Sequence, residues 1–178
     1  MILPIVKIPN KVLTTPTKPI KKVDAKILKL IADMEETLIV QTDPEGVGLA
    51  ATQIGQGISL FIIKSSKEAE AVAFINSKIL KVEQSTQKKV EKEDKSSLEG
   101  CLSIDKIWSP IRRPQKVLVQ YMNQKSELKE EWFEGFNAVI IQHEVDHLHG
   151  ILFTQRALEQ NKKIFKETDG DLQPIELP

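Results

Sequence analysis

Residues 135–150 read GFNAVIIQHEVDHLHG, a nearly continuous apolar run that turns abruptly polar and ends at a glycine. Gly150 suits the position after a helix C-terminus, and the run before it is long enough for a helix of about four turns. The apolar first half predicts that this helix is buried. Two histidines and two acids in its second half would cost several kcal/mol if they were buried without partners. The stretch therefore predicts a central helix with one chemical face.

His143 and His147 are four residues apart, so on a helix both imidazoles point to the same side, one turn apart. Glu144 lies about 100° further round the helix, close to an ion held by the histidines without having to bind it. This H-E-x-x-H pattern is typical of a metal site in which the glutamate takes a proton from water. The pattern also occurs by chance in unrelated chains, so an ordinary buried helix without a metal site remains an alternative interpretation.

The other polar residues of this helix have simpler interpretations. His149 lies about 200° from His147, so we expect it on the surface, away from the ion. Asp146 could orient a ligand imidazole or form a salt bridge to a nearby arginine such as Arg113, and a structural role is favoured.

Two histidines leave a catalytic metal one protein ligand short, because such sites commonly use three and keep one position open. Glu159 or Glu167 as third ligand would make the chain a thermolysin-like zinc peptidase. Cys101 is the competing candidate. It is the only cysteine of the chain, so it cannot form an internal disulfide, which is typical of a reducing compartment.

Length and composition indicate one ordinary globular domain over residues 1–178, with 40% hydrophobic and 28% charged residues. The 25 basic and 25 acidic residues give no net field that would attract DNA or a membrane surface. The N-terminal residues MILPIVKIPNK lack the layout of a secretory signal, and no apolar stretch approaches the length of a membrane span. We therefore expect a cytoplasmic protein, bacterial by default.

The remaining elements predict an α+β fold, with mostly antiparallel sheets packed around the central helix. Asp24 can cap an amphipathic helix over residues 24–40. No long helices that could serve as parallel crossovers separate the β-prone runs, which are 59–64, 72–76, 79–83, 116–121 and 129–133. Residues 84–98 are predicted to be a polar excursion and residues 169–178 a flexible tail.

Three separated motifs resemble the signature motifs of the peptide deformylase family, in that family's order: GVGLAATQ (46–53), EGCLS (99–103) and QHEVDH (142–147). The resemblance extends over roughly residues 3–155. It implies an enzyme that removes the formyl group from the N-terminal formyl-methionine of new polypeptides and releases formate. The expected partner is the nascent N-formylmethionyl polypeptide, with transient contact to the ribosome and a monomeric state as further expectations.

The resemblance also implies the metal ligands, which are Cys101, His143 and His147. The ion would acidify a bound water, and Glu144 would take the proton and later deliver it to the leaving amine. Family resemblance suggests Fe²⁺ as the native ion and Zn²⁺ as a common occupant, with Ni²⁺ and Co²⁺ also compatible.

The same resemblance assigns stabilisation of the formyl oxygen to the Gln53 side-chain amide and the backbone N–H of Leu102. Methionine selectivity requires an apolar pocket beside the metal, and core packing is the alternative role for most of the candidates. The predicted substrate-binding residues are Val47, Gly48, Phe136, Val139 and Ile140.

The chain departs from the family pattern at the rim of the expected substrate groove. Asp105 stands where a proline is common, and Ser97 and Trp108 also differ from what is usual there. Because of these departures, a catalytically inactive, metal-binding relative remains an alternative interpretation of the chain, in addition to the zinc peptidase described above.

Overall fold

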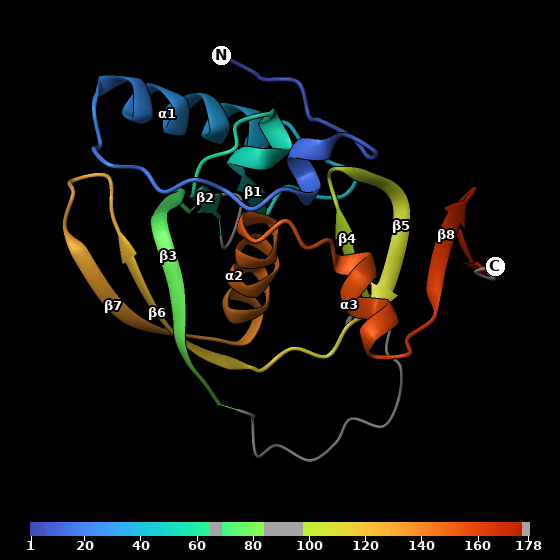
Figure 1. Cartoon of the computed structure of the whole chain (residues 1–178). Helices are drawn as coiled ribbons and strands as arrows, with labels where there is room; N and C mark the ends of the chain where they lie inside the picture. The colour runs from blue at the N-terminus through green and yellow to red at the C-terminus, as the bar shows by residue number, and fades with distance from the viewer. Residues whose placement is uncertain (65–68, 84–97, 176–178) are drawn as a thin grey trace.

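The structure is a computed structural model that describes residues 1–64, 69–83 and 98–175. Two antiparallel sheets enclose helix α2 (Gly135–Leu148), and Figure 1 shows α2 between strands β3, β6 and β7 on one side and β4 and β5 on the other. The predicted fold class, an α+β protein built around this helix, is confirmed. The predicted polar excursion lies outside the described residues, except for Leu98 at its end.

The first sheet has five strands in the order β1 (Gly48–Ala50), β2 (Leu60–Ile63), β3 (Val72–Glu83), β6 (Lys116–Met122) and β7 (Leu128–Glu134). Each neighbouring pair is antiparallel. The runs predicted at 59–64, 116–121 and 129–133 are confirmed as strands. The two runs predicted at 72–76 and 79–83 are a single strand, interrupted by an irregular register near Asn76, whose φ is 52°.

The second sheet was not predicted. Its strands follow the order β4 (Leu98–Cys101), β5 (Ile104–Pro110), β8 (Ile164–Thr168) and β9 (Asp171–Ile175). The prediction of a flexible tail over residues 169–178 is wrong for Asp171–Ile175, which pair with β8 along the whole strand.

Helix α1 (Ala25–Ile39) confirms the predicted helix, and the Asp24 side chain caps it by accepting from the backbone N–H groups of Lys26 and Ile27. Three shorter helical segments complete the fold: η1 (Lys11–Thr14), η2 (Ala51–Ile54) and α3 (Phe153–Glu159).

The first sheet is covered on both faces, because successive side chains of a strand point to opposite sides. In β2, Phe61 and Ile63 join the core cluster of α2, whereas Leu60 and Ile62 join the cluster that contains α1 residues. Phe61 stacks on Phe74 of β3, with ring centroids 4.7 Å apart. Each such fully buried side chain contributes about 1.5–3 kcal/mol. This packing holds α2 firmly and so fixes the positions of its polar residues.

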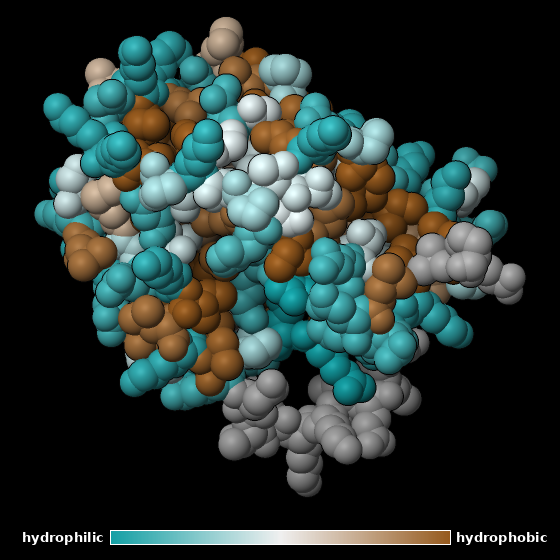
Figure 2. Space-filling view, in the orientation of Figure 1, coloured by the Kyte–Doolittle hydropathy of each residue, from teal (hydrophilic) through white to brown (hydrophobic). Residues whose placement is uncertain are grey.

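No described helix is both long enough and apolar enough to cross a membrane. On the face shown in Figure 2, hydrophilic and hydrophobic residues are interspersed.

Candidate metal centre and active site

The cysteine and two of the histidines meet in space although they are distant in sequence. Cys101 ends β4, and His143 and His147 lie one turn apart on α2. One ligand atom from each of the three residues lies within 4.8 Å of the other two. Cys101 Sγ is 3.3 Å from His147 Nε2, and both residues are buried. The described residues therefore contain a cluster that can bind one metal ion.

The alternative third ligands do not join this cluster. Glu159 Oε2 accepts a hydrogen bond from Arg156 Nη1 at 2.9 Å, and Glu167 Oε2 accepts one from Trp108 Nε1 at 2.8 Å. His149 is exposed, as the helical geometry predicted. The arrangement required for a thermolysin-like site is therefore absent from the part of the chain that the structure describes.

The cluster lowers the pKa of its thiol and raises the pKa of one of its imidazoles. Burial alone would raise the pKa of the Cys101 thiol, but the charge of His147 and hydrogen bonds with both imidazoles lower this pKa well below its ordinary value. Burial opposes the charged form of His143, yet contacts with Cys101 and Glu99 raise its pKa well above the ordinary value. These contacts thus favour the thiolate of Cys101, the form that binds metals, and a metal that binds His143 displaces its proton.

Glu99 orients His143, a role that the sequence analysis did not assign. Glu99 Oε2 lies 3.1 Å from His143 Nδ1. Burial opposes ionisation of the Glu99 carboxyl group, but hydrogen bonds with His143 and Arg113 lower the pKa of this group below its ordinary value. A carboxylate only accepts hydrogen bonds, so Nδ1 donates to Glu99, and Nε2 is the nitrogen that can bind a metal once it releases its own proton. Arg113 also pairs with Asp146 at 2.9 Å, which confirms the predicted salt bridge. Arg156 binds the same carboxylate at 2.7 Å.

Glu144 is buried beside this cluster, and burial raises the pKa of its carboxyl to about 7. Within the described part of the chain, its Oε2 has no hydrogen-bond partner. A carboxyl group with a pKa near neutrality can take up and release a proton at physiological pH. Gly48 packs directly on it, since a Cβ built on Gly48 would lie 2.4 Å from Glu144 Oε1.

The Gln53 side chain is oriented by its own backbone neighbourhood. Its Oε1 accepts from the Ala50 N–H at 2.8 Å, and its Nε2 donates to Cys101 Sγ at 3.4 Å. The amide N–H groups therefore face the metal cluster. Leu102 follows Cys101 in the tight turn between β4 and β5, and its carbonyl accepts from Lys7 Nζ at 2.6 Å. The fold thus brings both predicted oxygen-stabilising residues beside Cys101.

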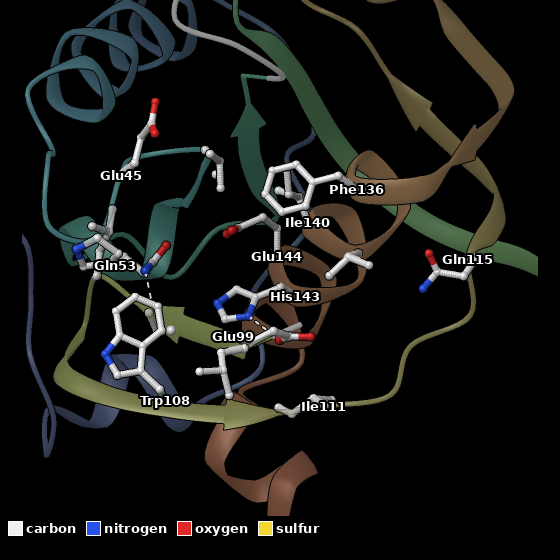
Figure 3. A pocket seen from close by; sticks show the side chains of 18 residues that line it. Glu45, Gln53, Glu99, Trp108, Ile111, Gln115, Phe136, Ile140, His143 and Glu144 are labelled. Carbon is white, nitrogen blue, oxygen red and sulfur yellow. Dashed lines mark hydrogen bonds and ion pairs between the residues drawn. The ribbon is translucent and has the colours of Figure 1, made fainter. Parts of the chain in front are cut away.

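A cavity of about 580 Å³ opens beside these groups. Figure 3 shows Glu144, His143 and Gln53 facing it, with Phe136 on the side of α2. The residues predicted to bind substrate all line this cavity: Val47, Gly48, Phe136, Val139 and Ile140. Ile140 also belongs to the core cluster, so the alternative role in packing applies to it at the same time.

An open cavity beside a cysteine, two imidazoles and a buried carboxyl group is the arrangement of a hydrolase that uses a single metal ion. The comparison with known sequences is more specific. The sequence model of the family described as Polypeptide deformylase matches residues 2–163, and the chain belongs to this family. Members of the family remove the formyl group from N-terminal formyl-methionine, and the resemblance found from the three motifs is confirmed.

Individual relatives agree over nearly the whole chain. A peptide deformylase of Mesorhizobium japonicum is 36% identical, and the match covers 99% of this chain and 98% of the relative. The crystal structure of peptide deformylase from Thermotoga maritima superposes with a TM-score of 0.75 at 35% identity, covering 88% of this chain and 97% of that one. A class I type b peptide deformylase from Acinetobacter baumannii with Met-Ala-Ser bound superposes with a TM-score of 0.74 at 30% identity, covering 88% and 98%.

Proposed function

We propose that this chain carries out the family's deformylation with Cys101, His143 and His147 as metal ligands and Glu144 as the group that moves protons. The observation that carries this proposal is the convergence of Cys101 with the two helical histidines at the side of an apolar cavity. The five-residue helical motif alone is compatible with several hydrolases, whereas a cysteine as third ligand separates this site from one with a downstream glutamate.

The residues present fit a divalent ion, because one thiolate and two imidazoles are donors that zinc and ferrous iron both accept. When bound, such an ion supplies a Lewis acid that acidifies water and polarises a carbonyl group. We further propose Fe²⁺ as the native ion and Zn²⁺, Ni²⁺ or Co²⁺ as substitutes. Metal analysis of protein purified without air, compared with activity after loading each ion, tests this order.

Glu144 moves the protons of the reaction. Its carboxylate form accepts a proton from the attacking water, and the resulting carboxylic acid donates that proton to the amine that leaves with the peptide. The pKa of about 7 supports this double role, because each form is accessible at neutral pH. The lack of a hydrogen-bond partner for Oε2 among the described residues leaves that oxygen available for the proton.

Gln53 and Leu102 position the formyl group and stabilise its oxygen. The Gln53 amide donates from one side of Cys101, and the Leu102 backbone N–H is proposed to donate from the other. Removing one such donor typically costs about 100- to 1,000-fold in rate. The wall formed by Val47, Val139 and Ile140 supplies the apolar surface for a methionine side chain.

The test is formate release from formyl-Met-Ala-Ser, measured together with bound metal, for the wild type and Glu144→Ala. The wild type is expected to release formate, and the variant is expected to keep its ion and lose turnover. A metal-loaded wild type that releases no formate would favour an inactive relative. Turnover that survives in Glu144→Ala would contradict the role of this residue.

We also propose that the protein is a monomer of the bacterial cytoplasm that meets its substrate during transient contact with the ribosome. Size-exclusion chromatography with light scattering tests the monomer, and co-sedimentation with purified ribosomes tests the contact.

A further inference from the structure

Trp108 lines the cavity, and its indole is hydrogen-bonded to Glu167, which lies outside the cavity. The side chain is half-buried on β5, where it faces the cavity in Figure 3. Its Nε1 donates to Glu167 Oε2 at 2.8 Å on β8, and Glu167 is not among the residues that line the cavity. The two strands pair through Trp108 and Phe165. The C-terminal strands therefore fix the orientation of one cavity wall.

The opposite strand constrains the same ring by close contact. A Cβ built on Gly100 would lie 2.7, 2.8 and 3.1 Å from three carbons of the indole. The indole thus packs against the backbone immediately before Cys101, which only a glycine allows. With one side against Gly100 and its nitrogen bound to Glu167, the ring has little freedom to turn.

Trp108 lies on a different side of the cavity from the residues proposed to bind the methionine side chain. Figure 3 shows the indole on the side of the second sheet, whereas Phe136 and Ile140 approach from α2 beside Glu144. A cavity of about 580 Å³ lies within the range of about 300–1,000 Å³ found for ligand pockets and has room for more than one apolar group. Among the described residues that line it, none is a lysine or an arginine. Trp108 therefore supplies an aromatic surface on the side of the cavity opposite α2.

We propose that Trp108 determines specificity for the residue that follows formyl-methionine and favours an aromatic side chain there. Glu167 is then a positioning residue that acts through Trp108. This inference rests on the proposed function, because it describes the second residue of the same substrate.

The experiment compares kcat/KM for formyl-Met-Phe-Ser with kcat/KM for formyl-Met-Ala-Ser, and the ratio of the two is the aromatic preference. An aromatic contact predicts a preference of about threefold to tenfold in the wild type. Trp108→Ala should reduce the ratio to near one. Glu167→Ala should lower it mainly by raising KM for the phenylalanine peptide, since the indole loses its acceptor. Glu167→Gln should keep it, because the amide oxygen still accepts from the indole.

Two controls separate positioning from general stability. Lys166→Ala changes an exposed neighbour on the same strand and should leave the ratio unchanged. Trp108→Phe keeps an aromatic wall but has no N–H donor, so adding Glu167→Ala to it should have no further effect on the ratio.

Fluorescence gives a readout that does not require turnover. The chain has two tryptophans, so Trp132→Phe leaves Trp108 as the only indole fluorophore. In that background the product Met-Phe-Ser should quench the emission more strongly than Met-Ala-Ser, and Glu167→Ala should shift the emission of the free protein.

The outcomes are distinguishable. If the wild type releases formate but Trp108→Ala keeps the same preference, the inference is wrong and the proposed function stands. If Glu167→Ala lowers kcat/KM equally for both peptides, its role is general stability and not positioning. If the metal-loaded wild type releases formate from neither peptide, the proposed function is wrong and the inference fails with it.

Discussion

Gly48 lies so close to Glu144 that a Cβ on the glycine would be 2.4 Å from the carboxylate oxygen Oε1. The same Cβ would be 2.9 Å from Ile140 Cγ2, so it could not be accommodated from either side. Strand β1 cannot easily move away, because Gly48 is paired with Ile63 in the five-stranded sheet. The backbone of β1 therefore limits where the Glu144 carboxyl group can lie.

Gly48→Ala is expected to lower kcat by about 100-fold, because a misplacement of about 1 Å in a catalytic group has a cost of that order. The metal content should stay unchanged, since the three atoms nearest to the new methyl group belong to Glu144 and Ile140 and not to the proposed ligands. Steady-state formate release with metal analysis checks both expectations. Gly57→Ala is the matched control, because a Cβ there meets nothing within 4 Å. Full activity in Gly48→Ala would show that Glu144 is not constrained in this way.

Glu99→Gln is expected to weaken metal binding by about 10- to 100-fold, because the carboxylate that orients His143 is replaced by a neutral amide. Competition with a chromophoric chelator measures the dissociation constant. Glu130→Gln changes an exposed glutamate of β7 and serves as the control. An unchanged dissociation constant for Glu99→Gln would mean that the hydrogen bond to His143 does not support the ligand.

Gln53→Glu tests the hydrogen-bond donor of the Gln53 side chain independently of its acceptor. The variant keeps an oxygen that can accept from Ala50 N–H but loses the amide donor that faces Cys101. The rate is expected to fall by at least about 100-fold with the fold retained. Circular dichroism checks the fold, and single-turnover formate release checks the rate. A variant as active as the wild type would exclude the Gln53 amide as the donor to the formyl oxygen.

Local sequence signals predicted most of the first sheet and both long helices, because their apolar patterns have regular periods. The second sheet was missed for two reasons. Strands β4 and β5 are joined by the turn Leu102-Ser103, which lacks the Asn-Gly or Asp-Gly pair typical of a two-residue hairpin. Between β8 and β9 the sequence does contain such a turn signal. Asp169-Gly170 joins these strands, and both residues have a positive φ, 53° and 84°. Pro174 disfavours a central strand, but proline is tolerated in an edge strand, which β9 is.

The candidate site was predictable where a motif fixes the spacing, as for His143 and Glu144 on one helix. Cys101 could be chosen over the glutamates only through the family resemblance, because its approach to α2 depends on how the sheets pack. Glu99 and Arg113 are close in the structure although fourteen positions apart in sequence. No local pattern marks such a contact. The anchoring of Trp108 by Glu167 was invisible for the same reason, since it required the unpredicted pairing of β5 with β8.

Tyr121 is the only tyrosine of the chain, so its ionisation can be followed by ultraviolet absorbance. Burial and the hydrogen bond to Glu131 raise the pKa of its phenol to about 12. The folded midpoint is expected near pH 12, and Glu131→Gln should lower it. Because the folded pKa lies above the unfolded one, the stabilisation is complete below about pH 10 and is lost as the pH rises through about 12. The free energy of unfolding of Tyr121→Phe should therefore fall less than that of the wild type between about pH 10 and about pH 12. A midpoint near 10 in samples that circular dichroism shows to be folded would contradict the burial of this ring.

The most direct measurement is the absorption spectrum of the cobalt-loaded protein together with its affinity for the ion, for the wild type and Cys101→Ala. Coordination by one sulfur and two imidazole nitrogens predicts an intense thiolate-to-cobalt charge-transfer band in the wild type, with one equivalent bound. In Cys101→Ala the band should disappear and binding should weaken strongly. A wild type without the band, or a variant that binds cobalt as tightly as the wild type, would contradict the ligand set from which the proposed chemistry is derived.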